Sequence, residues 1–322
     1  MGAHWHLLAF VISVVIAYLL TPWVRRLAIA LNVMDKPGGR RIHTRPIPRW
    51  GGIAVYAAFT LTLILISKIG GRFYPDIRLN TEMMGIIIAG ALLATIGLID
   101  DAKEMSAALQ VLGILTAAVV LMGFGICIQF VTNPFGEELI WLKWAAYPVT
   151  FLWIFALTKS MDLMDGLDGL AAGIGAIASG FLAIMAYYKA QPAVALMAAA
   201  LSGSCVGFLR FNFNPAKIFM GTVGSQFVGF ALAAISIVGL FKVAAAVAIA
   251  IPVLVFGVPI FDAVFVVWRR FVERRPIHMA DKSHIHHRLL RRGLSHKETV
   301  IFIWAMCFIL GGTALAIIMS NR

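Results

Sequence analysis

The sequence predicts an all-α polytopic membrane protein with about ten transmembrane helices, a short outside hairpin and both termini outside. Three observations support this. Of 322 residues, 61% are hydrophobic and only 13% charged, and the mean hydropathy is +0.91. A soluble domain of this size has too little interior to hide so much apolar surface. The apolar residues also gather in long runs, and the basic residues gather between those runs.

A bilayer core about 30 Å thick takes roughly 20 apolar residues per helix. The expected spans cover residues 4–23, 51–67, 83–99, 109–127, 145–160, 170–187, 193–209, 225–241, 243–266 and 300–319. The first span resembles a signal peptide but lacks a basic start, and Arg25 and Arg26 follow it, so we expect it to be retained. The ninth contains Pro252 and Pro259, so we expect a kink or a break. No internal repeat is evident, and we expect one domain over residues 1–322.

Two smaller features complete the outline. Residues 128–144 predict two short strands around Asn133-Pro134, outside the membrane. The three cysteines, Cys127, Cys205 and Cys307, all lie in apolar runs. An odd number of buried thiols argues against a disulfide framework.

The net charge of +12 is a matter of topology rather than of nucleic-acid binding. With the 24–50 and 267–299 loops inside, 20 of the 27 lysines and arginines lie inside and seven outside. The positive-inside rule then fixes the orientation. We expect a multi-pass protein of the bacterial inner membrane with a cytoplasmic active face and an anionic substrate, and no nucleic-acid partner.

Acidic residues are scarce, yet five of them map to this inner face: Asp100, Asp101, Asp162, Asp165 and Asp168. Aspartate favours helix N-termini, and capping could account for any one of them. Five carboxylates at membrane depth are costly unless they share a cation. Mg²⁺ typically uses one or two carboxylates together with substrate phosphates. The cluster therefore predicts a Mg²⁺-dependent phosphate chemistry, with Mn²⁺ as an alternative ion.

The inner loops add groups that suit phosphates. Gly221 precedes an expected helix, where a tight turn and free amides would favour a diphosphate. His284, His286, His287 and Arg288 could bind zinc, but no cysteine or carboxylate set completes a tetrahedron, so a nucleotide or sugar-phosphate clamp is favoured. A basic helix attracted to anionic lipid is the plain alternative. The first loop offers His43 and Arg45 in the same way.

These segments together resemble the polyprenyl-phosphate N-acetylhexosamine-1-phosphate transferases. The motifs that carry the resemblance run in order along nearly the whole chain: DKPGGRRIHTRPIPRWGG, GLIDDAKEMSA, DGLDGLAAG, NFNPAKIFMG with a following GS, and ADKSHIHHRLL. The HIHHRLL form of the last motif is more similar to the UDP-N-acetylglucosamine branch than to the phospho-N-acetylmuramoyl-pentapeptide branch.

The resemblance implies transfer of N-acetylglucosamine 1-phosphate from a UDP-sugar to undecaprenyl phosphate, a polyprenyl phosphate lipid, with release of UMP and a need for Mg²⁺. It implies catalytic roles for Asp100, Asp101, Asp165 and Asp168, and a metal site at Asp162 and Thr222. The expected substrate-binding residues are Lys159, Asn214, Gly221, His284, His286, His287, Arg288, Arg45 and His43. A homodimer is a further expectation.

The chain also departs from the family pattern. Thr222 stands where the family usually has a metal-binding Asp, and Asp162 and Lys159 stand where it usually has Asn. A Gln110 replaces an expected basic residue. One carboxylate is thus lost from the metal site and another is gained. Lys159 lies one helical turn before Asp162, and it either replaces the basic residue missing at position 110 or neutralises Asp162.

Alternative interpretations follow from these departures. A non-catalytic paralogue would keep the fold and bind lipid-linked sugar or a partner. A transporter is disfavoured, because no acidic residue lies near the middle of an expected span. Sequence does not choose between Asp100 or Asp101 as a base and a covalent aspartyl intermediate.

Overall fold

The computed structural model describes residues 4–35, 45–132, 139–240, 253, 255–272 and 284–320. The helices are α1 (Trp5–Ala30), α2 (Gly52–Ile69), α3 (Thr81–Lys103), α4 (Ala107–Gly123), α5 (Ala146–Met164), α6 (Leu170–Tyr188), α7 (Pro192–Asn212), α8 (Gly221–Leu240), α10 (Gly257–Val272), α11 (Ile285–Arg291) and α12 (His296–Ser320). The strands are β1 (Met34–Asp35), β2 (Ile47–Pro48), β3 (Phe130–Thr132) and β4 (Leu139–Trp141).

Within the described ranges, seven helical segments are long and apolar enough to cross a membrane, and the shorter α4 is also apolar. The all-α, multi-pass prediction is therefore confirmed. The number of ten spans and the side on which the termini lie stay predictions. The kink expected at Pro252 lies outside the described residues, and α10 begins only at Gly257.

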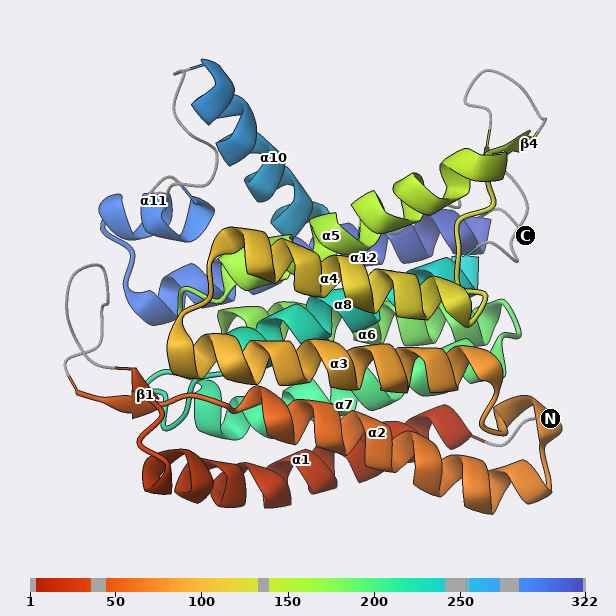
Figure 1. Cartoon of the computed structure of the whole chain (residues 1–322), viewed down its shortest axis with the longest axis horizontal. Coiled ribbons are helices and arrows are strands. Elements are labelled where there is room, and N and C mark those ends of the chain that lie inside the picture. The colour runs from red at the N-terminus through yellow and green to blue at the C-terminus, as the bar shows by residue number, and fades with distance from the viewer. Residues whose placement is uncertain are drawn as a thin grey trace.

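The long helices run side by side as a bundle, from which α5 and α10 lean away at one edge (Figure 1). Burial orders them into a centre and a rim. The apolar windows of α6, α7 and α8 are 78%, 78% and 89% buried, whereas those of α1 and α12 are each 28% buried. Apolar side chains of the rim helices stay on the surface, for example Leu19 and Ile309, as is expected where lipid replaces water.

Glycines bring α8 close to its neighbours. A Cβ added to Gly52 of α2 would lie 2.1 Å from the Cα of Gly224, and one added to Gly97 of α3 would lie 2.5 Å from the Cα of Val223. Small residues let membrane helices approach closely. The contact pins the start of α8 between the ends of α2 and α3. Gly224 is thus a packing residue inside α8.

The two ends of the bundle differ in character. The strands β1 and β2 pair as Met34 with Pro48 and Asp35 with Ile47, at the same end of the bundle as α11 (Figure 1). The strands β3 and β4 form the expected antiparallel hairpin at the other end, where both chain ends also lie. The prediction of two short strands at 128–144 is therefore confirmed, whereas the β1–β2 pair was not foreseen.

Candidate active site

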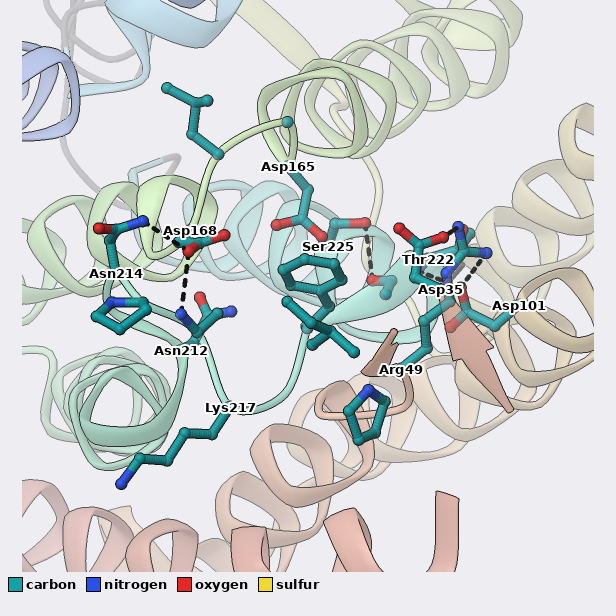
Figure 2. Close-up of a pocket in the computed structure, with 18 of the residues that line it drawn as sticks. Asp35, Arg49, Asp101, Asp165, Asp168, Asn212, Asn214, Lys217, Thr222 and Ser225 are labelled. Carbon is teal, nitrogen blue, oxygen red and sulfur yellow. Dashed lines mark hydrogen bonds and ion pairs between the residues drawn. The ribbon is translucent and has the colours of Figure 1, made fainter. Parts of the chain in front are cut away.

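A cavity of about 820 Å³ opens at the β1 end of the bundle. Charged and polar side chains from distant parts of the chain line it: Arg25, Asp35, Arg45, Arg49, Asp101, Asp162, Asp165, Asp168, Asn212, Asn214, Lys217, Thr222, Ser225, His287 and His296. Figure 2 shows two groups of them. Asp168, Asn212 and Asn214 lie on one side, Asp35, Arg49, Asp101 and Thr222 on the other, and Asp165 lies between.

Asp101 binds the start of α8. Its two carboxylate oxygens accept hydrogen bonds from the backbone amides of Thr222 at 3.0 Å and Val223 at 3.4 Å. Gly221 has φ +71°, and a Cβ at this position would lie 2.3 Å from Asp101 Oδ2. Only glycine accepts both the left-handed backbone and the close carboxylate. Because Asp101 occupies these amides, they are not free for a diphosphate, contrary to the role that the sequence suggested for them.

Arg49 adds a positive charge beside Asp101. Its Nη1 atom lies 4.0 Å from Asp101 Oδ1, and its Nη2 atom makes an ion pair with Asp35. The residue is held in place because the amide of Phe219 donates to the carbonyl of Pro48 at 2.8 Å and the amide of Gly51 donates to the carbonyl of Phe219 at 2.9 Å. The segment between α1 and α2 and the start of α8 are thus joined through their backbones.

Asp100 and Asp162 belong to one hydrogen-bonded chain that links α3, α4 and α5. Gln110 Nε2 donates to Asp100 Oδ1 at 2.8 Å, and its Oε1 accepts from Lys159 Nζ at 2.8 Å. Lys159 Nζ also lies 2.6 Å from Asp162 Oδ2, while the hydroxyl of Ser225 donates to Asp162 Oδ1 at 2.9 Å. Lys159 therefore neutralises Asp162 and reaches the glutamine that stands where a basic residue was expected.

Asp168 holds a second loop. Its Oδ2 accepts from Asn214 Nδ2 at 2.9 Å and from the amide of Ala216 at 3.0 Å, and its own amide donates to His296 Nε2 at 2.9 Å. Asn212, next to it, accepts from the amide of Gly169 at 3.0 Å. These bonds tie the 165–169 loop to the segment between α7 and α8, so both loops take part in one wall of the cavity.

Asp165 differs from the other four. It directly follows α5 and lines the cavity, and its carboxylate has no hydrogen bond or close ion pair with any residue that the structure describes. Burial, and then the carboxylates of Asp162, Asp101 and Asp168, raise the pKa of Asp165 well above its ordinary value, against a smaller opposing effect of Arg49. An unpaired carboxylate in such surroundings favours a cation or a proton.

The histidine segment contributes unevenly. His287 lines the cavity. His284 and His286 are buried at 5% and 2% exposure, and their rings stack at 5.9 Å. The guanidinium of Arg288 lies 5.0 Å from the ring centre of Phe265, on α10. Of this expected clamp, only His287 lines the cavity within the described ranges.

The remaining expected residues fall as follows. Arg45, Asn214, Gly221 and Thr222 line the cavity, and Lys159 reaches it only through Asp162. His43 lies outside the described residues. Sequence reasoning missed Arg49, Asn212, Lys217, Ser225 and His296 as lining residues. Arg49 and Asn212 stand within quoted motifs, so the signal for them was present, whereas nothing in the local sequence distinguishes His296.

The carboxylates do not form a closed metal site. Among the residues that the structure describes, no group of three His, Cys, Asp or Glu side chains is placed to hold a metal ion. Mg²⁺ needs only one or two protein carboxylates when substrate phosphates complete its shell. The unpaired carboxylate of Asp165 and the cavity-lining Thr222 fit such an open arrangement, whereas Asp162 is already neutralised by Lys159.

Comparison with known proteins agrees with this geometry. The sequence pattern of glycosyl transferase family 4 matches residues 83–240. A probable undecaprenyl-phosphate N-acetylglucosaminyl 1-phosphate transferase of Bacillus subtilis is 37% identical, over 96% of this chain and 84% of that protein. The chain belongs to the polyprenyl-phosphate N-acetylhexosamine-1-phosphate transferase family.

Other members of this transferase family are also similar. A decaprenyl-phosphate N-acetylglucosaminephosphotransferase of Mycolicibacterium smegmatis is 32% identical, over 91% of this chain and 77% of that protein. A phospho-N-acetylmuramoyl-pentapeptide-transferase of Caldicellulosiruptor bescii is 29% identical, over 97% and 96%. The resemblance to the family is confirmed, and the higher identities belong to its N-acetylglucosamine branch.

Proposed function

We propose that this protein transfers N-acetylglucosamine 1-phosphate from UDP-N-acetylglucosamine to undecaprenyl phosphate and releases UMP. The reaction would take place on the cytoplasmic face of a bacterial inner membrane, as the first membrane step of a cell-envelope polysaccharide. Support comes from the N-acetylglucosamine relatives and, above all, from one observation: an unpaired carboxylate, Asp165, in a cavity that also presents arginine and lysine.

The cavity offers charge and position rather than a nucleophile. Phosphoryl transfer depends mainly on holding the reacting groups in line and balancing their charge. Arg49 and Lys217 supply positive charge for the donor diphosphate and the acceptor phosphate. Asp101 keeps the first turn of α8 in place, and Asp168 keeps the Asn214 loop in place. The two walls around Asp165 are thereby fixed before substrate enters.

The acceptor needs little help from a base. A phosphate monoester loses its second proton near pH 6, so the lipid phosphate is mostly dianionic at neutral pH. The chain's task is then to bring two anions together. Mg²⁺, held by Asp165 with the hydroxyl of Thr222, would neutralise charge on the diphosphate. Asp162, paired with Lys159, would leave that role to Asp165.

The test is Mg²⁺-dependent UMP release by the purified protein in detergent, from UDP-N-acetylglucosamine and undecaprenyl phosphate. We expect turnover by the unchanged chain and compare it with Thr222→Asp. Turnover only with Thr222→Asp would support the fold and substrates but identify this chain as a non-catalytic form. Release from UDP-N-acetylmuramoyl-pentapeptide alone would place it in the other branch, and no release from either donor would overturn the proposal.

A further inference from the structure

A buried aspartate on α10 holds the short helix α11. Asp262 is 8% exposed. Its Oδ2 lies 2.7 Å from His284 Nδ1, and its Oδ1 accepts from the backbone amide of Ile285 at 2.7 Å. Both carboxylate oxygens therefore bind the residues at which α11 begins. A helix of seven residues is too short to be stable alone, so its position depends on such contacts.

Two more contacts set the direction in which α11 faces. The His286 ring lies against the acidic loop, since a Cβ added to Gly166 would be 2.6 Å from His286 Nε2. Arg288 lies over the ring of Phe265 on α10. His286 and Arg288 thus face neighbouring elements, and His287 between them lines the cavity. Asp262 binds the same helix one turn earlier but is not among the cavity-lining residues.

We propose that Asp262 is a positioning residue of the nucleotide-sugar site: it fixes α11 so that His287 faces the cavity. This rests on the proposed function for the identity of the ligand, a UDP-sugar. Asp262 would act through His287 and not through contact with substrate. Asp262→Asn keeps one acceptor oxygen where the carboxylate has two, so either the His284 imidazole or the Ile285 amide loses its partner, and a buried polar group without its partner is costly.

A double-mutant cycle on UMP release tests this dependence. We expect Asp262→Asn to raise the KM for UDP-N-acetylglucosamine about tenfold with a smaller change in kcat, the mark of weakened ground-state binding. His287→Ala should have a similar effect, and the double variant should be no worse than His287→Ala alone, because residues acting in series are not additive. Additive losses would overturn the proposal. Asp76→Asn, an exposed carboxylate change in the 3-10 turn Pro75–Ile77, is the matched control.

A second measurement does not depend on activity. In a Cys127→Ser background, where the remaining cysteines are buried, His287→Cys provides a thiol in the cavity for a water-soluble maleimide. We expect UDP to slow its labelling, and Asp262→Asn to weaken that protection, while Asp262→Glu restores it in part. If Asp262→Asn leaves the labelling rate and its protection unchanged, Asp262 has no positioning role, even if UMP release has been shown. If UDP gives no protection in the parent, the proposed donor is wrong. The role of Asp262 is then tested by comparing the labelling rate of the cysteine at position 287 with and without Asp262→Asn.

Discussion

The five carboxylates at the β1 end of the bundle differ in the hydrogen bonds that they make. Asp100 and Asp162 are linked by hydrogen bonds through Gln110 and Lys159. Asp101 and Asp168 accept hydrogen bonds from backbone amides. Of the five, only Asp165 has a carboxylate without a hydrogen bond within the described part of the chain. At the scale of single residues, the carboxylates that stabilise the fold can therefore be distinguished from Asp165, whose carboxylate is left for a ligand.

The first prediction concerns Asp165→Asn. We expect UMP release to fall at least about 100-fold, because the variant removes the one unpaired carboxylate near the transferred group. Thermal stability in detergent should stay the same or rise, because repulsion from three neighbouring carboxylates is relieved. Asp101→Asn is the comparison: it should lose activity and stability together, since only one acceptor oxygen remains for the two backbone amides of α8. Retained turnover in Asp165→Asn would remove its assigned role.

The second prediction concerns Lys159→Gln. Without the ammonium, Asp162 adds one negative charge to the cavity, so the Mg²⁺ concentration for half-maximal activity should fall several-fold. The measurement is a Mg²⁺ titration of UMP release at fixed ionic strength. Lys68→Gln, an exposed change at the far end of α2, should leave the titration as it is. An unchanged titration in Lys159→Gln would show that Asp162 does not influence the cation.

Single-residue predictions from the sequence had a clear limit. The aspartates could be assigned to one face because each ends or precedes an apolar run. Their partners could not, since Asp101 meets residue 222 and Asp168 meets Asn214 and His296 only after the helices pack. Asp101 accepts hydrogen bonds from amides in the first turn of α8. This explains why α8 begins at Gly221 and not at residue 225, where the predicted span begins.

At the scale of elements, α8 depends on close approach to α2 and α3. The third prediction is that Gly52→Ala destabilises the protein by about 1–3 kcal/mol, the usual range for overpacking. The added methyl would overlap the backbone at Gly224. The thermal unfolding midpoint in detergent is the readout. Gly312→Ala on α12, where no atom lies within 4 Å of the added Cβ, is the control and should be at least as stable as the parent.

The fourth prediction concerns α11 and acid. Burial, with the neighbouring His287, His284 and His296, lowers the pKa of His286 from 6.5 to about 3. As the pH falls through 6.5, the His286 imidazole therefore binds a proton in the unfolded chain but stays neutral in the folded chain. This contribution to stability is complete above pH 6.5 and is lost as the pH falls toward 3, by up to about 1.4 kcal/mol per pH unit.

The measurement is the unfolding midpoint between pH 7.5 and 4.5. We expect His286→Gln to show a shallower acid decline than the parent, while His4→Gln, an exposed change at the far end of α1, should follow the parent. Equal slopes for His286→Gln and the parent would show that His286 is not kept neutral by its surroundings.

At the scale of the whole molecule, the chain ends lie at the end of the bundle opposite β1 (Figure 1), and Asp35 of β1 lines the cavity. Hydropathy was enough to predict the all-α, multi-pass class, because most of the apolar runs are long, but it did not predict the short helix α11. The β1–β2 pair and the cavity depend on contacts between distant segments. No local pattern encodes them.

The fifth prediction is the orientation. We expect the cysteine of Lys297→Cys, at an exposed position in the first turn of α12, to react with an impermeant maleimide only in inside-out bacterial vesicles. A cysteine at Asp76 should react only in intact cells. The reverse pattern would place the cavity outside the inner membrane and contradict the positive-inside assignment.

The capping of α8 by Asp101 also bears on how relatives of this chain should be compared. A descendant that had given up sugar-phosphate transfer would still need Asp101, because the first turn of α8 binds it. The presence of this aspartate in a related sequence is thus evidence of a shared architecture and says little about whether the chemistry survives. The Asp165 carboxylate makes no such structural hydrogen bond, so we expect selection to preserve it only in proteins that still catalyse the reaction. In a relative that has lost the activity, we therefore expect Asp165 to be replaced before Asp101.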